Sequence, residues 1–172
     1  MKTTLLLGLL SGAALFAQTP APNKPKEDSL KKFAFLLGKW DAEGGGQPGT
    51  GMGAFSFDAE LDRHILVRHN YAQYDKGAEA GTRHDDLLIV YLESSTEGPR
   101  AIYFDSEGHV IHYAVATPKP DSVVFESDRS QPGPRYRLSY TLKGAKLEGI
   151  FEVADSSSAP YKTYLTWTST KK

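Results

Sequence analysis

The chain has 172 residues, 40% hydrophobic and 24% charged, a globular balance that excludes a disordered or fibrous protein. Its formal net charge of −1 provides no strong field for nucleic acid or anionic membranes, so neither is expected as a partner. Cysteine is absent, which excludes disulfides, thiolate metal sites and the lipid anchor of bacterial lipoproteins.

Residues 1–17 have the order of a secretory signal peptide. Lys2 provides a positive start, residues 5–16 are small or apolar, and Ala17 offers a small residue for cleavage. This apolar run is shorter than the roughly 20 residues that a membrane-spanning helix needs. We therefore expect no membrane span and a periplasmic or secreted protein whose mature chain begins near Gln18. The alternative is a buried N-terminal helix.

A flexible, proline-rich linker is predicted over residues 18–28, because its prolines favour an extended and solvated chain. The remaining residues, 29–172, form the predicted domain. It begins with a short amphipathic helix capped by Asp28 or Ser29 and ended by Gly38. The apolar residues of this helix are Leu30, Phe33, Leu36 and Leu37.

From Lys39 onward the hydrophobic pattern changes to the period of two that is typical of β-strands. The predicted strands are separated by turn signals rich in Gly, Pro and Asp, and no helix lies between them. Such short connections favour antiparallel hairpins, and closure removes the exposed edges of a long meander. We therefore predict an all-β fold, a closed antiparallel meander barrel of about ten strands, with a Greek-key sandwich as the alternative. The strands are predicted at 40–44, 53–59, 63–74, 86–93, 100–105, 109–117, 121–127, 135–142, 146–153 and 161–168.

The alternation also indicates which side chains face the interior. Phe151 is the clearest case, because Glu148 and Glu152 lie on the opposite face of its strand and Gly149, on its own face, leaves space. A barrel wider than about eight strands encloses a cavity, and tyrosine hydroxyls in its wall suit a small lipophilic or aromatic ligand with a polar group. An inward Arg68 would hold an acidic head. The predicted ligand-binding residues are Arg68, Tyr71, Tyr103, Tyr113, Tyr136, Tyr140, Phe151 and Trp167, with Phe55 beside them.

Two motifs carry a resemblance to a known family. Phe-Leu-Leu-Gly-Lys-Trp at 35–40, followed by three glycines at 44–46, resembles the opening of calycin-type barrels, and Tyr-Phe-Asp-Ser-Glu-Gly at 103–108 resembles a mid-chain hairpin of nitrobindin-like barrels and their exported bacterial relatives. The resemblance implies a lipocalin-like barrel in which Trp40 closes the floor. In nitrobindin-like proteins a late histidine holds haem. No histidine follows His112, so no cofactor is expected.

Other chemistry has weaker signals. His109 and His112 lie three residues apart, on opposite faces of a strand, so we expect no metal site. Residues 84–86, His-Asp-Asp, are interpreted as a solvated turn, with a cation site as the alternative, and the glycine-rich residues 44–51 as a flexible loop. Asp105 is interpreted as a cap of its turn, with an acid–base pair between Asp105 and His112 as the alternative.

No catalytic residues are predicted, because no nucleophile elbow is present. The predicted function is an exported binding protein for a small lipophilic molecule. A protein-interaction or structural barrel, or less readily an enzyme that uses the cavity as its active site, is the alternative.

Overall fold

The computed structural model describes residues 30–93, 98–129 and 133–172. The predicted signal peptide and the whole of the predicted linker lie outside these ranges. Among the described residues, no helix is long and apolar enough to cross a membrane.

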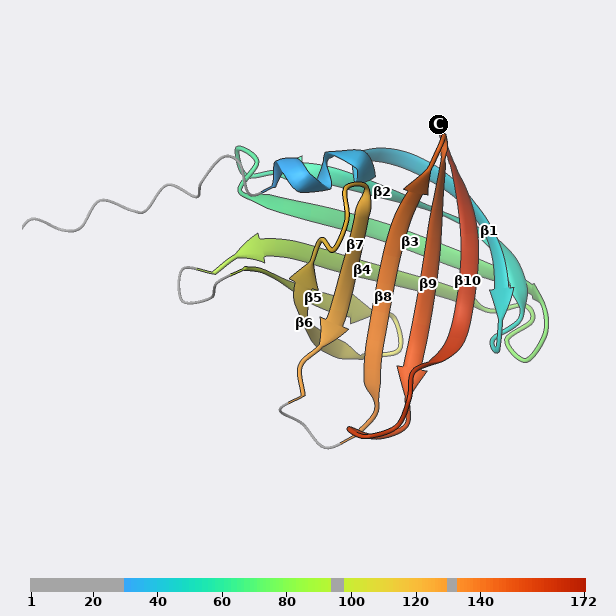
Figure 1. The fold of residues 1–172 in the computed structure, drawn as a ribbon. Helices are drawn as coiled ribbons and strands as arrows, with labels where there is room; N and C mark the ends of the chain where they lie inside the picture. Colours follow the sequence, from blue (N-terminus) through green and yellow to red (C-terminus); the bar gives the residue numbers. More distant parts are fainter. Residues whose placement is uncertain (1–29, 94–97, 130–132) are drawn as a thin grey trace, which may run out of the picture.

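Ten strands form one closed antiparallel barrel (Figure 1). Each strand pairs with the next along the chain, and the first strand pairs with the last, which confirms the predicted ten-stranded meander. The strands are β1 (Gly38–Gly46), β2 (Thr50–Glu60), β3 (Ile65–Lys76), β4 (Arg83–Leu92), β5 (Pro99–Asp105), β6 (Val110–Ala116), β7 (Ser122–Ser127), β8 (Arg135–Lys143), β9 (Lys146–Ala154) and β10 (Lys162–Lys171).

The predicted amphipathic α-helix is wrong: the described residues before β1 form only a short 3₁₀ helix, η1 (Lys31–Leu36). Leu30, Phe33 and Leu36 are spaced three residues apart, which is the period of a 3₁₀ helix rather than of an α-helix. Phe33 and Leu36 are its buried residues. In Figure 1 this helix (blue) lies at the upper end of the barrel.

An aromatic core fills the barrel end that lies beneath η1. Phe33, Leu36, Trp40, Phe57 and Leu147 are at most 1% exposed there. The indole Nε1 of Trp40 donates a hydrogen bond to the carbonyl of Leu36 at 2.8 Å, which ties β1 to η1. Trp40 thus lies at a closed end of the barrel, as the resemblance implied.

The glycine-rich segment is not a loop over most of its length. Gly44 and Gly46 lie within β1, and Gly51 lies within β2. A Cβ at Gly44 would lie 2.2 Å from the carbonyl oxygen of Thr166, so the glycine permits β1 and β10 to approach closely. Only residues 47–49 connect the two strands.

The barrel end opposite η1 is formed by the hairpins at 47–49, 77–82, 106–109 and 155–161, and we call it the mouth. Inward-facing rings near it, those of Tyr103, Tyr136 and Phe151, are only half-buried, in contrast to the sealed rings beneath η1. The inward-facing rings are thus less buried at the mouth than beneath η1.

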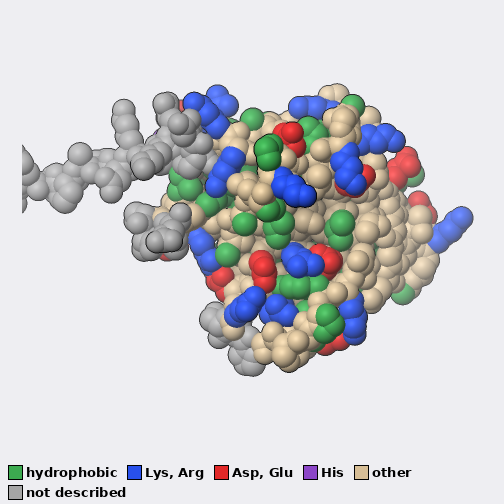
Figure 2. Space-filling view, in the orientation of Figure 1, with side chains coloured by type: hydrophobic (Ala, Val, Ile, Leu, Met, Phe, Trp, Pro, Cys, Tyr) green, Lys and Arg blue, Asp and Glu red, His purple; other side chains and the backbone are tan. Residues whose placement is uncertain are grey.

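The outer wall carries interspersed charges of both signs. Figure 2 shows lysine and arginine side chains lying beside aspartate and glutamate on the face in view. On β8 and β9, Arg137 pairs with Glu152 at 2.6 Å and Lys143 pairs with Glu148 at 2.6 Å. Because neighbouring charges largely cancel, this face presents no extended patch of one sign.

Candidate functional site

A buried ion pair lies inside the barrel, between the neighbouring strands β3 and β4. Arg68 of β3, 4% exposed, donates hydrogen bonds to the carboxylate of Asp86 on β4 and to the hydroxyl of Tyr140 on β8. Asn70 lies directly opposite Asp86 in the β3–β4 register and donates to its Oδ2 at 2.7 Å. Residues from three strands thus hold one charged centre inside an otherwise largely apolar wall.

Arg68 and Asp86 each stabilise the charged form of the other. Burial works against the ionised form of Asp86, but the charge of Arg68 and hydrogen bonds from His84, Arg68 and Asn70 outweigh it and hold the Asp86 pKa below its ordinary value. Burial likewise works against the charge of Arg68, yet Asp86 raises the Arg68 pKa overall. Both groups are therefore charged, and together they carry no net charge.

One donor of the centre is free within the part of the chain that the structure describes. The Nε of Arg68 is buried and has no hydrogen-bond partner there. A buried N–H without a partner costs about 1–3 kcal/mol, so such a group points to a missing acceptor. The nearby ring of Tyr140, itself 1% exposed, restricts the direction from which an acceptor can approach.

His84 extends the polar network from the ion pair toward the mouth. It is the next inward residue of β4, and its Nε2 lies 3.0 Å from the Tyr103 hydroxyl and 3.3 Å from Asp86 Oδ2. Its Nδ1 lies 2.8 Å from Glu107 Oε2. The hydrogen bond with Asp86 raises the His84 pKa, with burial acting against this shift.

The interpretation of residues 84–86 as a solvated turn is wrong, because all three lie within β4. The alternation of the strand turns His84 and Asp86 inward and leaves Asp85 outside, where it pairs with Arg83 at 2.7 Å.

Asp105 caps its turn, as predicted. Its Oδ1 accepts hydrogen bonds from the backbone N–H groups of Glu107 at 3.1 Å and His109 at 2.8 Å. Its Oδ2 lies 2.9 Å from Nδ1 of His109. His112, the residue considered as its acid–base partner, is exposed and lies in the β6 strand next to buried Tyr113.

Most of the predicted ligand-binding residues do face the interior. Arg68, Tyr113 and Tyr140 are at most 4% exposed, while Tyr103, Tyr136, Phe151 and Trp167 are half-buried. The ring of Tyr136 stacks on that of Phe151 with centroids 5.9 Å apart. The space expected above Gly149 is occupied by the indole of Trp167, which a Cβ at Gly149 would approach to 2.0 Å.

Tyr71 lies apart from this set. It is 36% exposed, and the guanidinium of Arg83 lies 4.2 Å from its ring centroid. The β3–β4 register turns Arg68 and Asn70 inward, so Tyr71 must face outward. There it lines a shallow hollow of the outer wall together with Lys39, Arg83, Leu87, Phe104 and Lys172.

Sequence reasoning missed four residues of the network: Asn70, His84, Asp86 and Glu107. The alternation of β4 was the available signal, because His84, Asp86, Leu88 and Val90 share one face. The apolar run of residues 87–92 obscured it, since a run without polar positions does not show which face is inward.

The ten-stranded closed barrel is consistent with a calycin-like fold. No protein-family model matches the chain, and no curated protein matches it. With no such match, the barrel and the charged centre inside it are the features that describe the class of this protein.

Proposed function

We propose that this protein is an exported binding protein that holds a small lipophilic or aromatic molecule inside the barrel. The observation that carries the proposal is the free Nε–H of Arg68, a buried donor without a partner among the described residues. The half-buried rings between Arg68 and the mouth, those of Tyr103, Tyr136 and Phe151, support an apolar body for the ligand.

The charged centre favours an uncharged ligand over an acid. Asp86 already neutralises Arg68, so a carboxylate placed at Nε would add an unbalanced negative charge to a buried site. A carbonyl or hydroxyl oxygen accepts the same hydrogen bond without that cost. The ligand class is thus a lipophilic or aromatic molecule with a neutral acceptor, which revises the acidic head expected from Arg68 alone.

The test uses native mass spectrometry of protein purified from its own host, followed by titration with N-phenyl-1-naphthylamine, an uncharged aromatic fluorophore. We expect a co-purified small molecule and saturable enhancement of fluorescence by the stripped protein. Phe151→Ala, which removes one ring of the Tyr136–Phe151 stack, should lower the affinity for the probe by more than about tenfold. Phe104→Ala, on the outer wall, is the matched control and should leave binding unchanged.

The variant Arg68→Lys tests the role of the Nε–H donor of Arg68. It keeps a positive charge beside Asp86 but lacks the Nε–H, so ligands with an acceptor should lose affinity while the apolar probe should not. Loss of probe binding in Phe104→Ala together with normal binding in Phe151→Ala would place binding on the outer wall. That result would favour the protein-interaction alternative, for which exposed Tyr71 and Phe104 supply a surface.

The proposal includes two expectations from the sequence. Export from the cytoplasm is expected from residues 1–17, and N-terminal sequencing of the exported fraction should give a start near Gln18. Descent with the nitrobindin-like barrels is supported by the motifs at 35–40 and 103–108, although haem is not expected as the ligand.

A further inference from the structure

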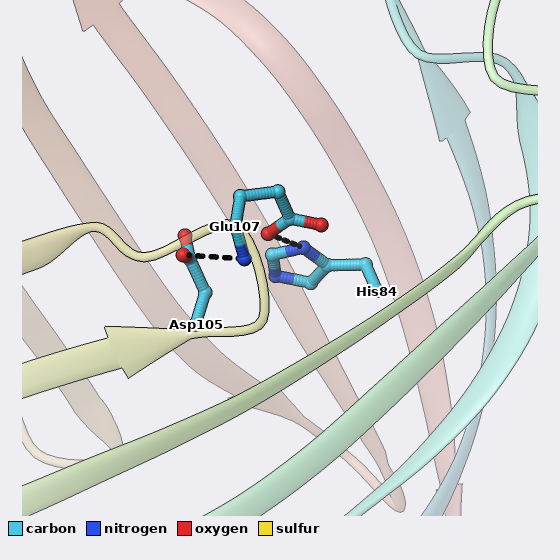
Figure 3. A group of neighbouring side chains, drawn as sticks. All are labelled: His84, Asp105 and Glu107. Atoms are coloured by element: carbon cyan, nitrogen blue, oxygen red, sulfur yellow. Dashed lines mark hydrogen bonds and ion pairs between the residues drawn. The ribbon is translucent and has the colours of Figure 1, made fainter.

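Three side chains with metal-ligating atoms converge at the mouth (Figure 3). His84 comes from β4, Asp105 from the end of β5, and Glu107 from the turn that follows β5. One ligand atom from each lies within 4.8 Å of the other two. In Figure 3 the imidazole of His84 and the carboxylate of Glu107 point toward each other, with Asp105 on the other side of the turn.

We propose that this cluster binds a divalent transition-metal cation such as Zn²⁺ through Nδ1 of His84, Oδ2 of Asp105 and the carboxylate of Glu107. Zn²⁺ takes imidazole nitrogen and carboxylate oxygen at roughly 2.0–2.2 Å, and three protein ligands leave a position for water. Two carboxylates balance the charge of the cation. The imidazole favours a transition metal over Ca²⁺ or Mg²⁺, which prefer oxygen ligands alone.

The surroundings of His84 provide a second, independent observation. A metal-binding histidine usually donates its other ring N–H to a carboxylate, which fixes the ring and its tautomer. Nε2 of His84 lies 3.3 Å from Oδ2 of Asp86, whose side chain is 3% exposed. Arg68 and Asn70 hold Asp86 in place. The buried centre thus orients the ring so that Nδ1 faces Glu107 at the mouth.

Asp105 is oriented in a similar way. Because its Oδ1 accepts two backbone N–H groups of the turn, its Oδ2 is left for other partners. The Tyr103 hydroxyl donates to that Oδ2 at 3.3 Å and also contacts Nε2 of His84, so one tyrosine supports two of the three ligands. His109 contacts Oδ2 as well, but its side chain is 62% exposed, so its ring can turn away without leaving a buried group unpaired.

The test is titration of the full-length, chelator-treated protein with ZnCl₂ by isothermal calorimetry, repeated with Co²⁺ while its visible d–d absorption is recorded. We expect saturable uptake of one cation per chain. His84→Ala and Glu107→Gln should each lower the affinity for Zn²⁺ by more than about tenfold and change the absorption spectrum of bound Co²⁺. Glu107 is 47% exposed, so Glu107→Gln keeps the barrel folded and separates loss of a ligand from loss of structure.

His112→Ala is the matched control, because it removes an exposed histidine of β6 outside the cluster. The Zn²⁺ affinity of this variant should stay within about twofold of that of the unaltered protein. Uptake that fails to saturate, or that is unchanged in both His84→Ala and Glu107→Gln, would overturn the metal site. The titrant is the metal alone, so this outcome is independent of whether the barrel holds a lipophilic ligand.

Discussion

Arg68 is held inside the barrel by hydrogen bonds to Asp86 and Tyr140, and Asn70 in turn holds Asp86. Removing two charges from water costs several kcal/mol per ion, and their attraction offsets this cost only with good geometry. At the residue scale, loss of one partner of this pair should therefore lower the free energy of unfolding far more than loss of both.

The first prediction concerns this pair. Arg68→Met leaves the Asp86 carboxylate buried and unpaired, so the free energy of unfolding should fall by about 3–5 kcal/mol. The measurement is urea-induced unfolding followed by circular dichroism. Combining Arg68→Met with Asp86→Leu should restore part of the loss, because no charge then remains buried.

Arg137→Met is the control for that experiment. Arg137 pairs with Glu152 on the outer wall, where its side chain is 34% exposed, so the change should cost about 1 kcal/mol or less. Equal losses for Arg68→Met and Arg137→Met would mean that water reaches the interior pair and screens it.

Gly149 offers a second test at this scale. A Cβ there would lie 2.0 Å from Cε2 of Trp167, so Gly149→Ala must displace the indole and should destabilise the barrel by about 1–3 kcal/mol. A Cβ at Gly98 would meet no atom of the described residues within 4 Å, so Gly98→Ala should change the free energy of unfolding by no more than about 0.5 kcal/mol. Unfolding curves of the two variants, run side by side, check this; an unperturbed Gly149→Ala would show that the indole has room to move.

At the scale of elements, η1 and β1 act as one unit. The hydrogen bond from Trp40 to the Leu36 carbonyl is buried, and it fixes the short helix over the end of the barrel. An isolated helix of this length has little stability of its own, so its packing must hold it in place.

The third prediction follows from this contact. Trp40→Phe keeps an aromatic ring but removes the donor, which leaves the Leu36 carbonyl unpaired at a buried position. We expect a loss of about 1–3 kcal/mol from the unpaired carbonyl, measured by urea unfolding, and a further loss from the smaller ring. A total below about 0.5 kcal/mol would show that water or a shift of η1 satisfies the carbonyl.

Strand β10 shows why the sequence could not predict, for every strand, which side chains face the barrel interior. Strict alternation would place Tyr161, Thr163, Leu165 and Trp167 together on one face of the strand. A bulge between Thr163 and Leu165 shifts the register against β9, so Thr163 is exposed and Tyr161 lies under the guanidinium of Arg137, 4.1 Å from its ring centroid. A bulge adds one residue to one strand, and nothing in the apolar pattern of that strand marks its position.

At the scale of the whole molecule, the interior network links the stability of the barrel to pH. His84 has a folded pKa above its unfolded value of about 6.5, so its contribution is fully present below about pH 6.5 and is lost as the pH rises through the folded pKa. Asp86 has a folded pKa below its unfolded value of about 3.9, so its contribution is present above about pH 4 and is lost as the pH falls further.

The fourth prediction is that the free energy of unfolding declines as the pH rises above about 6.5, and that His84→Gln removes much of this decline. Urea unfolding at several pH values, for the unaltered protein and for His84→Gln, measures the difference directly. His64→Gln is the control, because His64 is exposed at the opposite end of the barrel and its ring hydrogen-bonds with the backbone carbonyls of Leu61 and Asp62. Parallel pH curves for all three proteins would contradict the assignment to His84.

The strand order was predictable because it depends on local signals, namely turn residues and short spacing. An inward Arg68 was compatible with Leu66 on the same face of β3, but the sequence did not decide between this and a surface position, because Val67 on the other face is apolar too. The pairing of Arg68 with Asp86 was not predictable, because it depends on which residues of β3 and β4 lie opposite each other, and that register is set by the closed barrel as a whole. Convergence of Glu107 on His84 likewise depends on how the β5–β6 turn folds back over β4.

Closure of the barrel has a consequence for how the chain is made. The seam runs from Trp40 opposite Lys171 to Gly46 opposite Leu165, so it joins the first strand to the last. During synthesis, β1 leaves the ribosome long before β10 exists to pair with it. Until then both edges of the growing sheet can bind other chains. The two edges of the sheet therefore stay unpaired until β10 has emerged and the seam has closed.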